Sequence, residues 1–156
     1  MAHKYEKFGS RNFHPSGIGT SNGEGEGDIM YYGGTTVAAG KVYILQTQEC
    51  GEGADDEECV EWVAADADNA NSSNLIAVAR GSGAANTVGM LLRGMVTIPS
   101  GVAVSSGGGP IYISTTLGAV TATIPSATND YVRILGYAIK DNVMWFSPDN
   151  SYIKIG

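Results

Sequence analysis

Short runs rich in β-branched and aromatic residues recur along this sequence, and turn-forming residues separate them. Ten such runs begin about a dozen residues apart, a spacing typical of sandwiches and barrels. They are 29–32, 41–46, 60–64, 75–80, 90–98, 111–114, 119–123, 131–139, 143–146 and 151–155. Separators such as Gly33-Gly34 and Asp141-Asn142 are turn-forming residues, and the second predicts a tight hairpin turn. The sequence therefore predicts an all-β fold, a small β-barrel or sandwich of about ten short strands.

Length and glycine content agree with this class. The chain has 156 residues, the size of one domain, and contains 22 glycines. Glycine is about twice as frequent as its usual share of about 7%, as expected for a chain with many tight turns. No window of a dozen residues keeps an apolar 3.6-residue period without a glycine, and 67–74 is the best helical candidate. We expect a single β domain at 28–156, preceded by a flexible N-terminal arm at 1–27.

The predicted arm is polar, punctuated by glycines and without a period of either 2 or 3.6 residues. Segments of this composition order against a partner. Aromatic and basic residues alternate in its first half: Tyr5, Lys7, Phe8, Arg11 and Phe13. Two interpretations remain open, an anchor that binds a partner through these residues and a frayed terminus.

Negative charge is concentrated at 49–61, which contains seven acidic residues and no Lys or Arg. The net charge of the chain is −7, so the remaining acids and bases balance. Nucleic acids and anionic membranes are bound mainly through Lys and Arg, and we expect neither as a partner. The segment is interpreted as the solvated tip of a β-hairpin, and calcium binding by its carboxylates is the alternative.

Cys50 and Cys59 flank this acidic tip. If 43–46 and 60–64 pair as a hairpin, the two cysteines lie within disulfide reach. In the chain-entropy model a bridge across such a loop stabilises the fold by about 2–3 kcal/mol. The alternative is two free thiols, since a cytosol keeps cysteines reduced until the protein leaves the cell.

Two predicted strands, 90–98 and 131–139, are apolar on both faces. In the first, Met90, Leu92 and Val96 share one face, and the opposite face is only half polar. Such a strand needs cover on both sides, which a small domain supplies at its centre or at a subunit contact. We therefore expect self-association.

Arg93 and Arg133 stand in the middle of these two strands. A buried arginine must be paired, and Asp66 and Asp68 are the predicted partners, in ion pairs at or beside a subunit interface. The alternative is two arginines that extend to solvent from an exposed sheet face.

Catalytic motifs are lacking from the sequence. Its two histidines lie in the predicted arm, where nothing holds an imidazole against a serine or cysteine. It contains no Gly-x-Ser-x-Gly elbow after a strand and no phosphate-binding Gly-x-x-x-x-Gly-Lys-Ser/Thr loop. Aspartate pairs, Asp66 with Asp68 or Asp130 with Asp141, are the remaining candidates, as in a glycoside hydrolase. We expect a non-enzymatic protein with no catalytic residue, metal site or cofactor.

Secretion and membrane insertion are not predicted. No run approaches the roughly 18 apolar residues of a membrane helix. The polar start lacks the apolar core of a signal peptide, so we expect synthesis in a host cytoplasm without one.

Several segments occur in an order and at spacings that resemble a module of tailed-phage structural proteins. The similarity extends over residues 28–155, and the acidic loop and the arm have no counterpart in the module. The segments include Gly40-Lys41-Val42-Tyr43, Ala65-Asp66-Ala67-Asp68, Gly109-Pro110-Ile111-Tyr112, Val132-Arg133-Ile134-Leu135-Gly136-Tyr137 and Trp145-Phe146-Ser147-Pro148. The module resembles capsid decoration, or cement, proteins, and it also occurs within head- and tail-fibre proteins.

The resemblance implies a small β-barrel-like fold that forms a homotrimer and binds the major capsid protein on the virion surface. The implied role is physical, because a trimer that buries surface on several capsid subunits stabilises the shell. A tail- or head-fibre module for host-surface recognition is the closest alternative, and a hydrolase of surface glycans is a more distant one.

Overall fold

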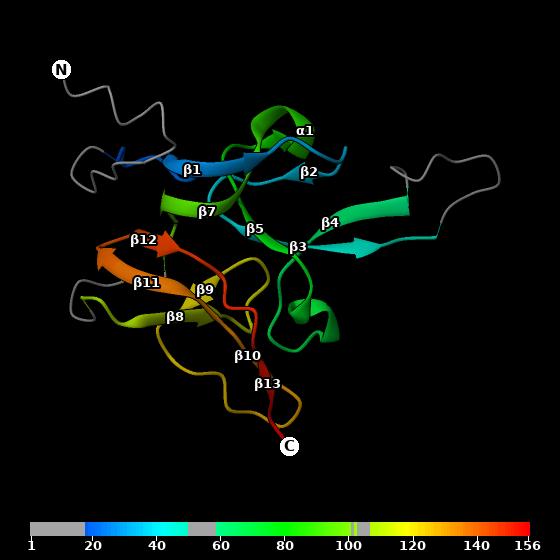
Figure 1. Cartoon of the computed structure of the whole chain (residues 1–156), viewed down its shortest axis with the longest axis vertical. Coiled ribbons are helices and arrows are strands. Elements are labelled where there is room, and N and C mark those ends of the chain that lie inside the picture. The colour runs from blue at the N-terminus through cyan, green and yellow to red at the C-terminus, as the bar shows by residue number, and fades with distance from the viewer. Residues whose placement is uncertain (1–17, 50–58, 101, 103–106) are drawn as a thin grey trace.

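The computed structural model describes residues 18–49, 59–100, 102 and 107–156. These residues form thirteen β-strands, one short α-helix and one 3-10 helix (Figure 1). The strands are β1 (Gly25–Met30), β2 (Thr36–Val37), β3 (Val42–Thr47), β4 (Val60–Ala64), β5 (Ile76–Ala79), β6 (Gly83–Ala84), β7 (Met90–Thr97), β8 (Pro110–Ile113), β9 (Val120–Thr121), β10 (Tyr131–Val132), β11 (Ile134–Lys140), β12 (Val143–Phe146) and β13 (Ile153–Lys154). The helices are the 3-10 helix η5 (Ala70–Ser73) and α1 (Ala85–Val88). The predicted all-β class is confirmed.

Eight strands form one antiparallel path, β4-β3-β5-β7-β12-β11-β8-β9, and β1 pairs with β7 outside it. Each predicted run overlaps a strand, but 131–139 divides at Arg133 into β10 and β11. The sequence pattern does not predict β2 and β6, which are only two residues long. The predicted hairpin turn between β11 and β12 is confirmed, and its Asn142 has a φ of 59°.

Backbone hydrogen bonds beyond β4 bring the two ends of this path together. The N–H of Gly118 donates to the carbonyl of Ala65 (2.8 Å), whose own N–H donates to the carbonyl of Val42 (3.0 Å). The N–H of Ala67 donates to the carbonyl of Ser114 (3.0 Å). Ser114 and Gly118 lie in the connection from β8 to β9. The chain that follows β4, the first strand of the path, is therefore hydrogen-bonded beside β9, the last strand of the path. The sheet is curled into a half-barrel (Figure 1).

Two hydrophobic clusters fill the domain. The larger one lines the inside of the half-barrel and includes Ile44, Leu91 and Phe146. The smaller one includes Tyr43 and Met90, on the opposite face of the same strands, together with buried residues of β2 and α1. The apolar second face of β3 and of the start of β7 is therefore covered within one chain, without the subunit contact expected from the sequence.

Strand β1 begins inside the segment predicted as an arm, 1–27, so that boundary is wrong. It pairs with β7 so closely that Gly27 lies opposite Gly94. A Cβ at Gly27 would lie 2.0 Å from the carbonyl oxygen of Arg93, and a Cβ at Gly94 would lie 2.1 Å from that of Glu26. Both glycines have a positive φ, +155° and +147°. Glycine is thus required at this crossing because no other residue fits the space or the backbone.

Candidate functional site

The outer face of the half-barrel carries a row of large side chains across β7, β12 and β11. Met95 lies opposite Trp145, and Trp145 lies opposite Tyr137. Residues directly opposite in an antiparallel pair share one face of the sheet. The two residues that flank Trp145 belong to the inner cluster, so alternation directs Trp145 outward. The name outer aromatic face is used below for Arg93, Trp145 and Tyr137, together with Met95, which is itself buried.

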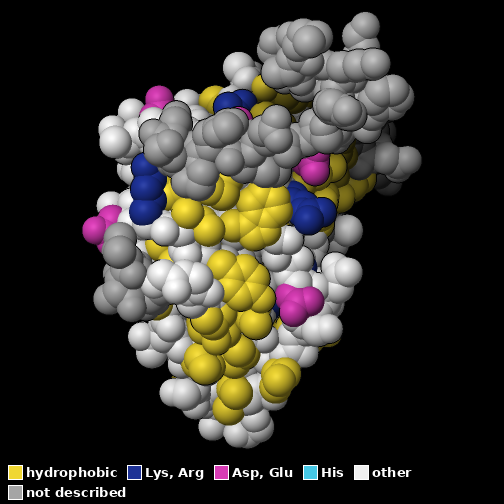
Figure 2. Space-filling view, turned by 60° about the vertical axis from the view of Figure 1, so that its left-hand side comes forward, with side chains coloured by type: hydrophobic (Ala, Val, Ile, Leu, Met, Phe, Trp, Pro, Cys, Tyr) yellow, Lys and Arg dark blue, Asp and Glu magenta, His cyan; other side chains and the backbone are white. Residues whose placement is uncertain are grey.

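This face combines a cation with exposed aromatic surface. The guanidinium carbon of Arg93 lies 5.5 Å from the centre of the Trp145 ring, a cation–π contact. Tyr137 is 43% exposed. Figure 2 brings the side with β11 and β12 forward and shows a band of hydrophobic side chains flanked by basic ones. Tyr, Trp, Met and Arg are the residue types enriched at protein interfaces, so the face is suited to binding another protein surface.

Within the single chain Arg93 is not buried, which corrects the prediction of a buried arginine at this position. Its side chain is exposed and contacts the Trp145 ring. The alternative prediction, an arginine that extends from an exposed sheet face, is confirmed at this position. Pairing of β7 with β12 provides a flat aromatic surface on which the guanidinium lies.

Arg133 is buried, and its partners are backbone carbonyls. Its Nε donates to the carbonyl oxygen of Asp149 (2.8 Å). Its Nη1 donates to the carbonyl oxygens of Ser72 (2.9 Å) and Asn74 (2.6 Å). Burial lowers the pKa of the guanidinium from its ordinary value, and the negative charge of Asp149 opposes this shift. Arg133 thereby ties the end of η5 to the segment that follows β12.

Asp66 and Asp68 lie beside Asp130 instead of forming the predicted ion pairs with the arginines, a correction to the sequence interpretation. The N–H of Asp68 donates to Oδ1 of Asp66 (3.0 Å), and the N–H of Ala127 donates to Oδ2 of the buried Asp130 (2.9 Å). A hydrogen bond with the Asp130 side chain raises the pKa of Asp68, and desolvation and the charge of Asp66 act in the same direction. In the described ranges, no group of three or more His, Cys, Asp or Glu is arranged to hold a metal ion. Asp66 and Asp130 thus accept hydrogen bonds from the backbone of the loops in which they lie.

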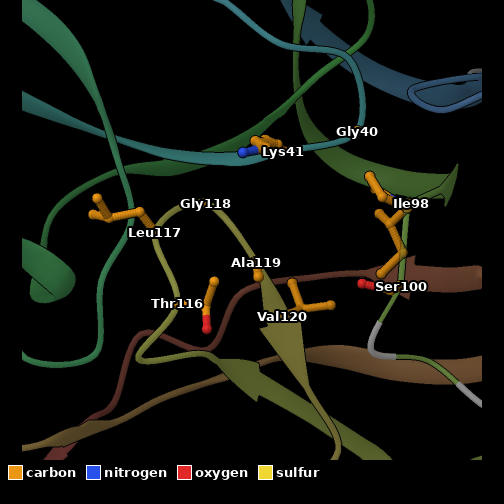
Figure 3. A pocket seen from close by; sticks show the side chains of 10 residues that line it. Gly40, Lys41, Ile98, Ser100, Thr116, Leu117, Gly118, Ala119 and Val120 are labelled. Atoms are coloured by element: carbon orange, nitrogen blue, oxygen red, sulfur yellow. The ribbon is translucent and has the colours of Figure 1, made fainter.

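One cavity, of about 210 Å³, opens where the ends of the curled sheet meet (Figure 3). Its walls come from three segments: Gly40-Lys41, Ile98 to Ser100, and Thr116 to Val120. Small-molecule sites usually measure about 300–1,000 Å³, so this cavity has room for a single side chain. Gly40 and Lys41 are among the residues that carry the phage-protein resemblance, and here they lie where the sheet closes.

The predicted hairpin before the acidic segment is confirmed, because β3 and β4 pair from Tyr43 opposite Ala64 to Thr47 opposite Val60. Cys59 is disulfide-bonded, which agrees with the predicted bridge and excludes a free thiol at this position. The predicted partner, Cys50, lies outside the described residues.

Two further predictions also lie outside the described residues. One concerns the anchor formed by Tyr5, Lys7, Phe8, Arg11 and Phe13. The other concerns the acidic tip between Cys50 and Cys59. Both remain predictions.

A second aromatic group, which the sequence pattern does not predict, lies on the pair of strands β10 and β13. The rings of Tyr131 and Tyr152 have centres 5.7 Å apart and are tilted by 42°. Nζ of Lys154 lies 5.8 Å from the centre of the Tyr131 ring. Strand alternation places Tyr152 and Lys154 on one face and is visible in the sequence. Their proximity to Tyr131 depends on the register with β10, which the sequence does not reveal.

Comparison of the chain with protein-family models, with curated proteins and with solved structures finds no match. Among the helices of the described residues, none has the length and apolar character needed to cross a membrane.

Proposed function

We propose that this chain is a non-enzymatic structural protein of a phage particle, a decoration protein that binds the outside of the capsid. The outer aromatic face carries this proposal, because its exposed residue types are those that favour binding of another protein. The resemblance over residues 28–155 supports the same assignment. The partners are other copies of the chain, in a homotrimer, and the major capsid protein.

Self-association through the outer aromatic face uses the residue types that dominate binding energy at interfaces. Trp, Tyr and Arg are the most frequent hot-spot residues, and truncation of one costs about 2 kcal/mol or more of binding free energy. Trp145 and Tyr137 lie side by side on adjacent strands, so a partner that covers one also covers the other. Arg93 adds a charge whose cation–π contact strengthens when the partner excludes water.

Stabilisation of the shell then follows from multivalency. A trimer presents three equivalent capsid-binding surfaces, and binding of the first raises the effective concentration of the others. Ligands that bind only the assembled shell stabilise it by mass action. In this proposal the N-terminal arm, with Tyr5, Phe8 and Phe13, binds the capsid, and the acidic tip points outward.

The non-enzymatic part of the proposal has its support in the carboxylates. Asp66, Asp68 and Asp130 are the densest acidic group of the described residues, and their hydrogen bonds hold loop backbone and one another. Asp130 lines a cavity of about 300 Å³, and it is the one carboxylate among the lining residues. A glycosidase instead presents two carboxyl groups on either side of its substrate groove.

The test is the mass of the free protein and of a double variant, Trp145→Ala with Tyr137→Ala, measured by light scattering after size exclusion. We expect a trimer for the parent chain and a monomer for the variant, with an unchanged circular dichroism spectrum. Ile124→Ala removes an apolar side chain that is 55% exposed, more than Tyr137, and should leave the trimer intact. A monomeric parent chain, or a trimer that survives the double change, would contradict the proposal.

Copy number per particle separates decoration from the fibre alternative. Hundreds of copies are expected for a decoration protein, and tens or fewer for a tail- or head-fibre module. Quantitative mass spectrometry of purified particles, with the major capsid protein as the internal standard, gives this number.

A further inference from the structure

Strand β13 is paired on one edge only. It forms a two-stranded antiparallel sheet with β10, in which Tyr131 lies opposite Lys154 and Val132 lies opposite Ile153. In the described part of the chain, no strand pairs with its other edge. An open edge presents unpaired backbone groups that template pairing with another strand.

Backbone hydrogen bonds show which groups of β13 face outward. The N–H of Ile155 donates to the carbonyl of Asp130 (2.9 Å), so Ile155 directs its backbone toward β10. The N–H of Tyr131 donates away from β13, to the carbonyl of Ala67 (2.7 Å). Tyr131 and Lys154 are therefore a non-hydrogen-bonded pair. Because the direction alternates along a strand, Tyr152 and Lys154 direct their N–H and C=O groups to the open edge.

The side chains on this edge are unusually apolar for an open edge. Ile153 is 67% exposed and Tyr152 is 47% exposed. The charge on the edge, Lys154, is held over the Tyr131 ring at 5.8 Å. Protected edges carry outward charges or prolines, and this edge has neither a proline nor a second charge between Ser151 and Ile155.

We infer that β13 pairs with β13 of a second copy of this chain, antiparallel and with the two-fold axis at Ile153. This register places Tyr152 of each copy opposite Lys154 of the other, so that the outward backbone groups meet and form four hydrogen bonds. Each Lys154 then faces a tyrosine ring of the other copy, the contact that it already makes with Tyr131. The two Ile153 side chains meet on the opposite face, extended on each side by Val132.

The register is specific because strand pairing has a period of two residues. A shift by one residue would turn the outward backbone groups of one copy toward groups that already bond β10. The contact is also closed, since the same surface serves both copies and leaves no edge for a third.

This contact goes beyond the proposed function, because it uses a surface separate from the outer aromatic face. A contact of two short strands is small and therefore weak between free chains. Copies held close together, as subunits or on a common surface, gain a high effective concentration. The edge of β13 thus links neighbouring copies that are already concentrated by other contacts.

Disulfide trapping of Ile153→Cys tests the pairing. Residues at a non-hydrogen-bonded position have Cα atoms about 4.5 Å apart, within the range of about 4.4–6.8 Å that a disulfide spans. Cys59 is already disulfide-bonded and does not compete. Under mild oxidation we expect Ile153→Cys to form covalent dimers on a non-reducing gel much faster than Leu117→Cys, whose parent side chain is 58% exposed. Equal rates for the two variants would overturn the inference.

Charge changes at Tyr152, made in the Ile153→Cys background, test the register. Tyr152→Lys places like charges opposite one another across two pairs, and trapping should slow by about 2- to 30-fold. Tyr152→Glu places opposite charges there, and trapping should become faster. The same response to both changes would contradict the register, and trapping of Ile153→Cys to a capsid subunit without dimers would identify a different occupant.

One experiment tests the β13 contact independently of the proposed function. Trp145→Ala with Tyr137→Ala removes the outer aromatic face and leaves β13 intact. In that background, Ile153→Cys should still give dimers at high protein concentration, while the trimer is lost. Loss of the dimers together with the trimer would show that β13 forms no contact of its own.

Discussion

Arg133 and Arg93 occupy similar places in the sequence and opposite environments in the fold. Each stands in a run that is apolar on both faces, yet Arg133 is 6% exposed and Arg93 lies in solvent over Trp145. Arg133 sits at the break between β10 and β11, where carbonyl oxygens of two neighbouring segments converge on it. Arg93 sits inside β7, whose own carbonyls serve the pairing with β1 and β12. Alternation does not identify the face along the whole of β7, because Met90 and Val96, predicted on one face, belong to opposite clusters. The position of strand ends decides whether a charge is buried.

The largest expected effect is at the buried arginine. Arg133→Met leaves the carbonyls of Ser72, Asn74 and Asp149 without their donor, and we expect a loss of about 3–5 kcal/mol in the free energy of unfolding. Urea unfolding at neutral pH measures this loss. Arg93→Met is the matched control and should change stability by less than about 1 kcal/mol. Losses of equal size at the two positions would remove the distinction between them.

A second effect concerns the backbone beside Arg93. Gly94→Ala places a Cβ about where the carbonyl oxygen of Glu26 lies and forces a strained φ, so we expect a loss of about 2–4 kcal/mol. Gly108 also has a positive φ, +74°, but a Cβ there would meet no atom within 4 Å. Gly108→Ala should therefore cost only about 1–2 kcal/mol, the strain of the backbone alone. Equal losses would mean that crowding by β1 contributes nothing.

The sequence predicts strands well and their environments poorly. Turn residues and two-residue alternation locate the hairpin at Asp141-Asn142, because both signals are local. The sequence pattern does not predict that a strand begins at Gly25. Its glycines are needed because β1 lies close to β7, a contact between segments far apart in the chain. The environment of Arg133 is not predictable for the same reason, since its carbonyl partners lie 16 to 61 residues away in the sequence. The outer aromatic face needs the register of three strands, of which the sequence shows only the alternation.

Substitution of the exposed Arg93 is expected to change stability less than substitution of Arg133. It is expected to change subunit association more. Arg93→Ala removes the cation–π contact with Trp145, worth about 0.5–1 kcal/mol at an exposed site, and we expect a loss of stability within that range. In the trimer the same change should weaken subunit association, as measured by sedimentation equilibrium. Arg93→Lys keeps a cation over the ring and should restore part of both. An unchanged melting temperature together with an unchanged trimer would exclude Arg93 from the interface.

The smallest effect is at the carboxylates that were expected to pair with these arginines. The pKa of Asp68 is raised in the folded state, chiefly by its hydrogen bond with Asp130. The folded protein therefore binds this proton more tightly than the unfolded chain does. Above the raised pKa the ionised Asp68 destabilises the fold, and this penalty is relieved as the pH falls through that pKa toward the unfolded value of about 3.9.

Asp68→Asn should accordingly raise the melting temperature slightly at pH 7, and the gain should shrink as the pH falls through the raised pKa of the parent carboxyl. Scanning calorimetry across this range measures the difference between variant and parent. Asp130→Asn removes the other carboxylate, and in that background Asp68→Asn should have little effect, because coupled sites are not additive. A gain that does not shrink as the pH falls, or one that survives in the Asp130→Asn background, would show that Asp68 is strained by something other than its neighbouring carboxylate. Arg133 would then be the next candidate for the source of that strain. The carbonyls of Ser72 and Asn74, which accept its hydrogen bonds, follow Asp68 in the chain.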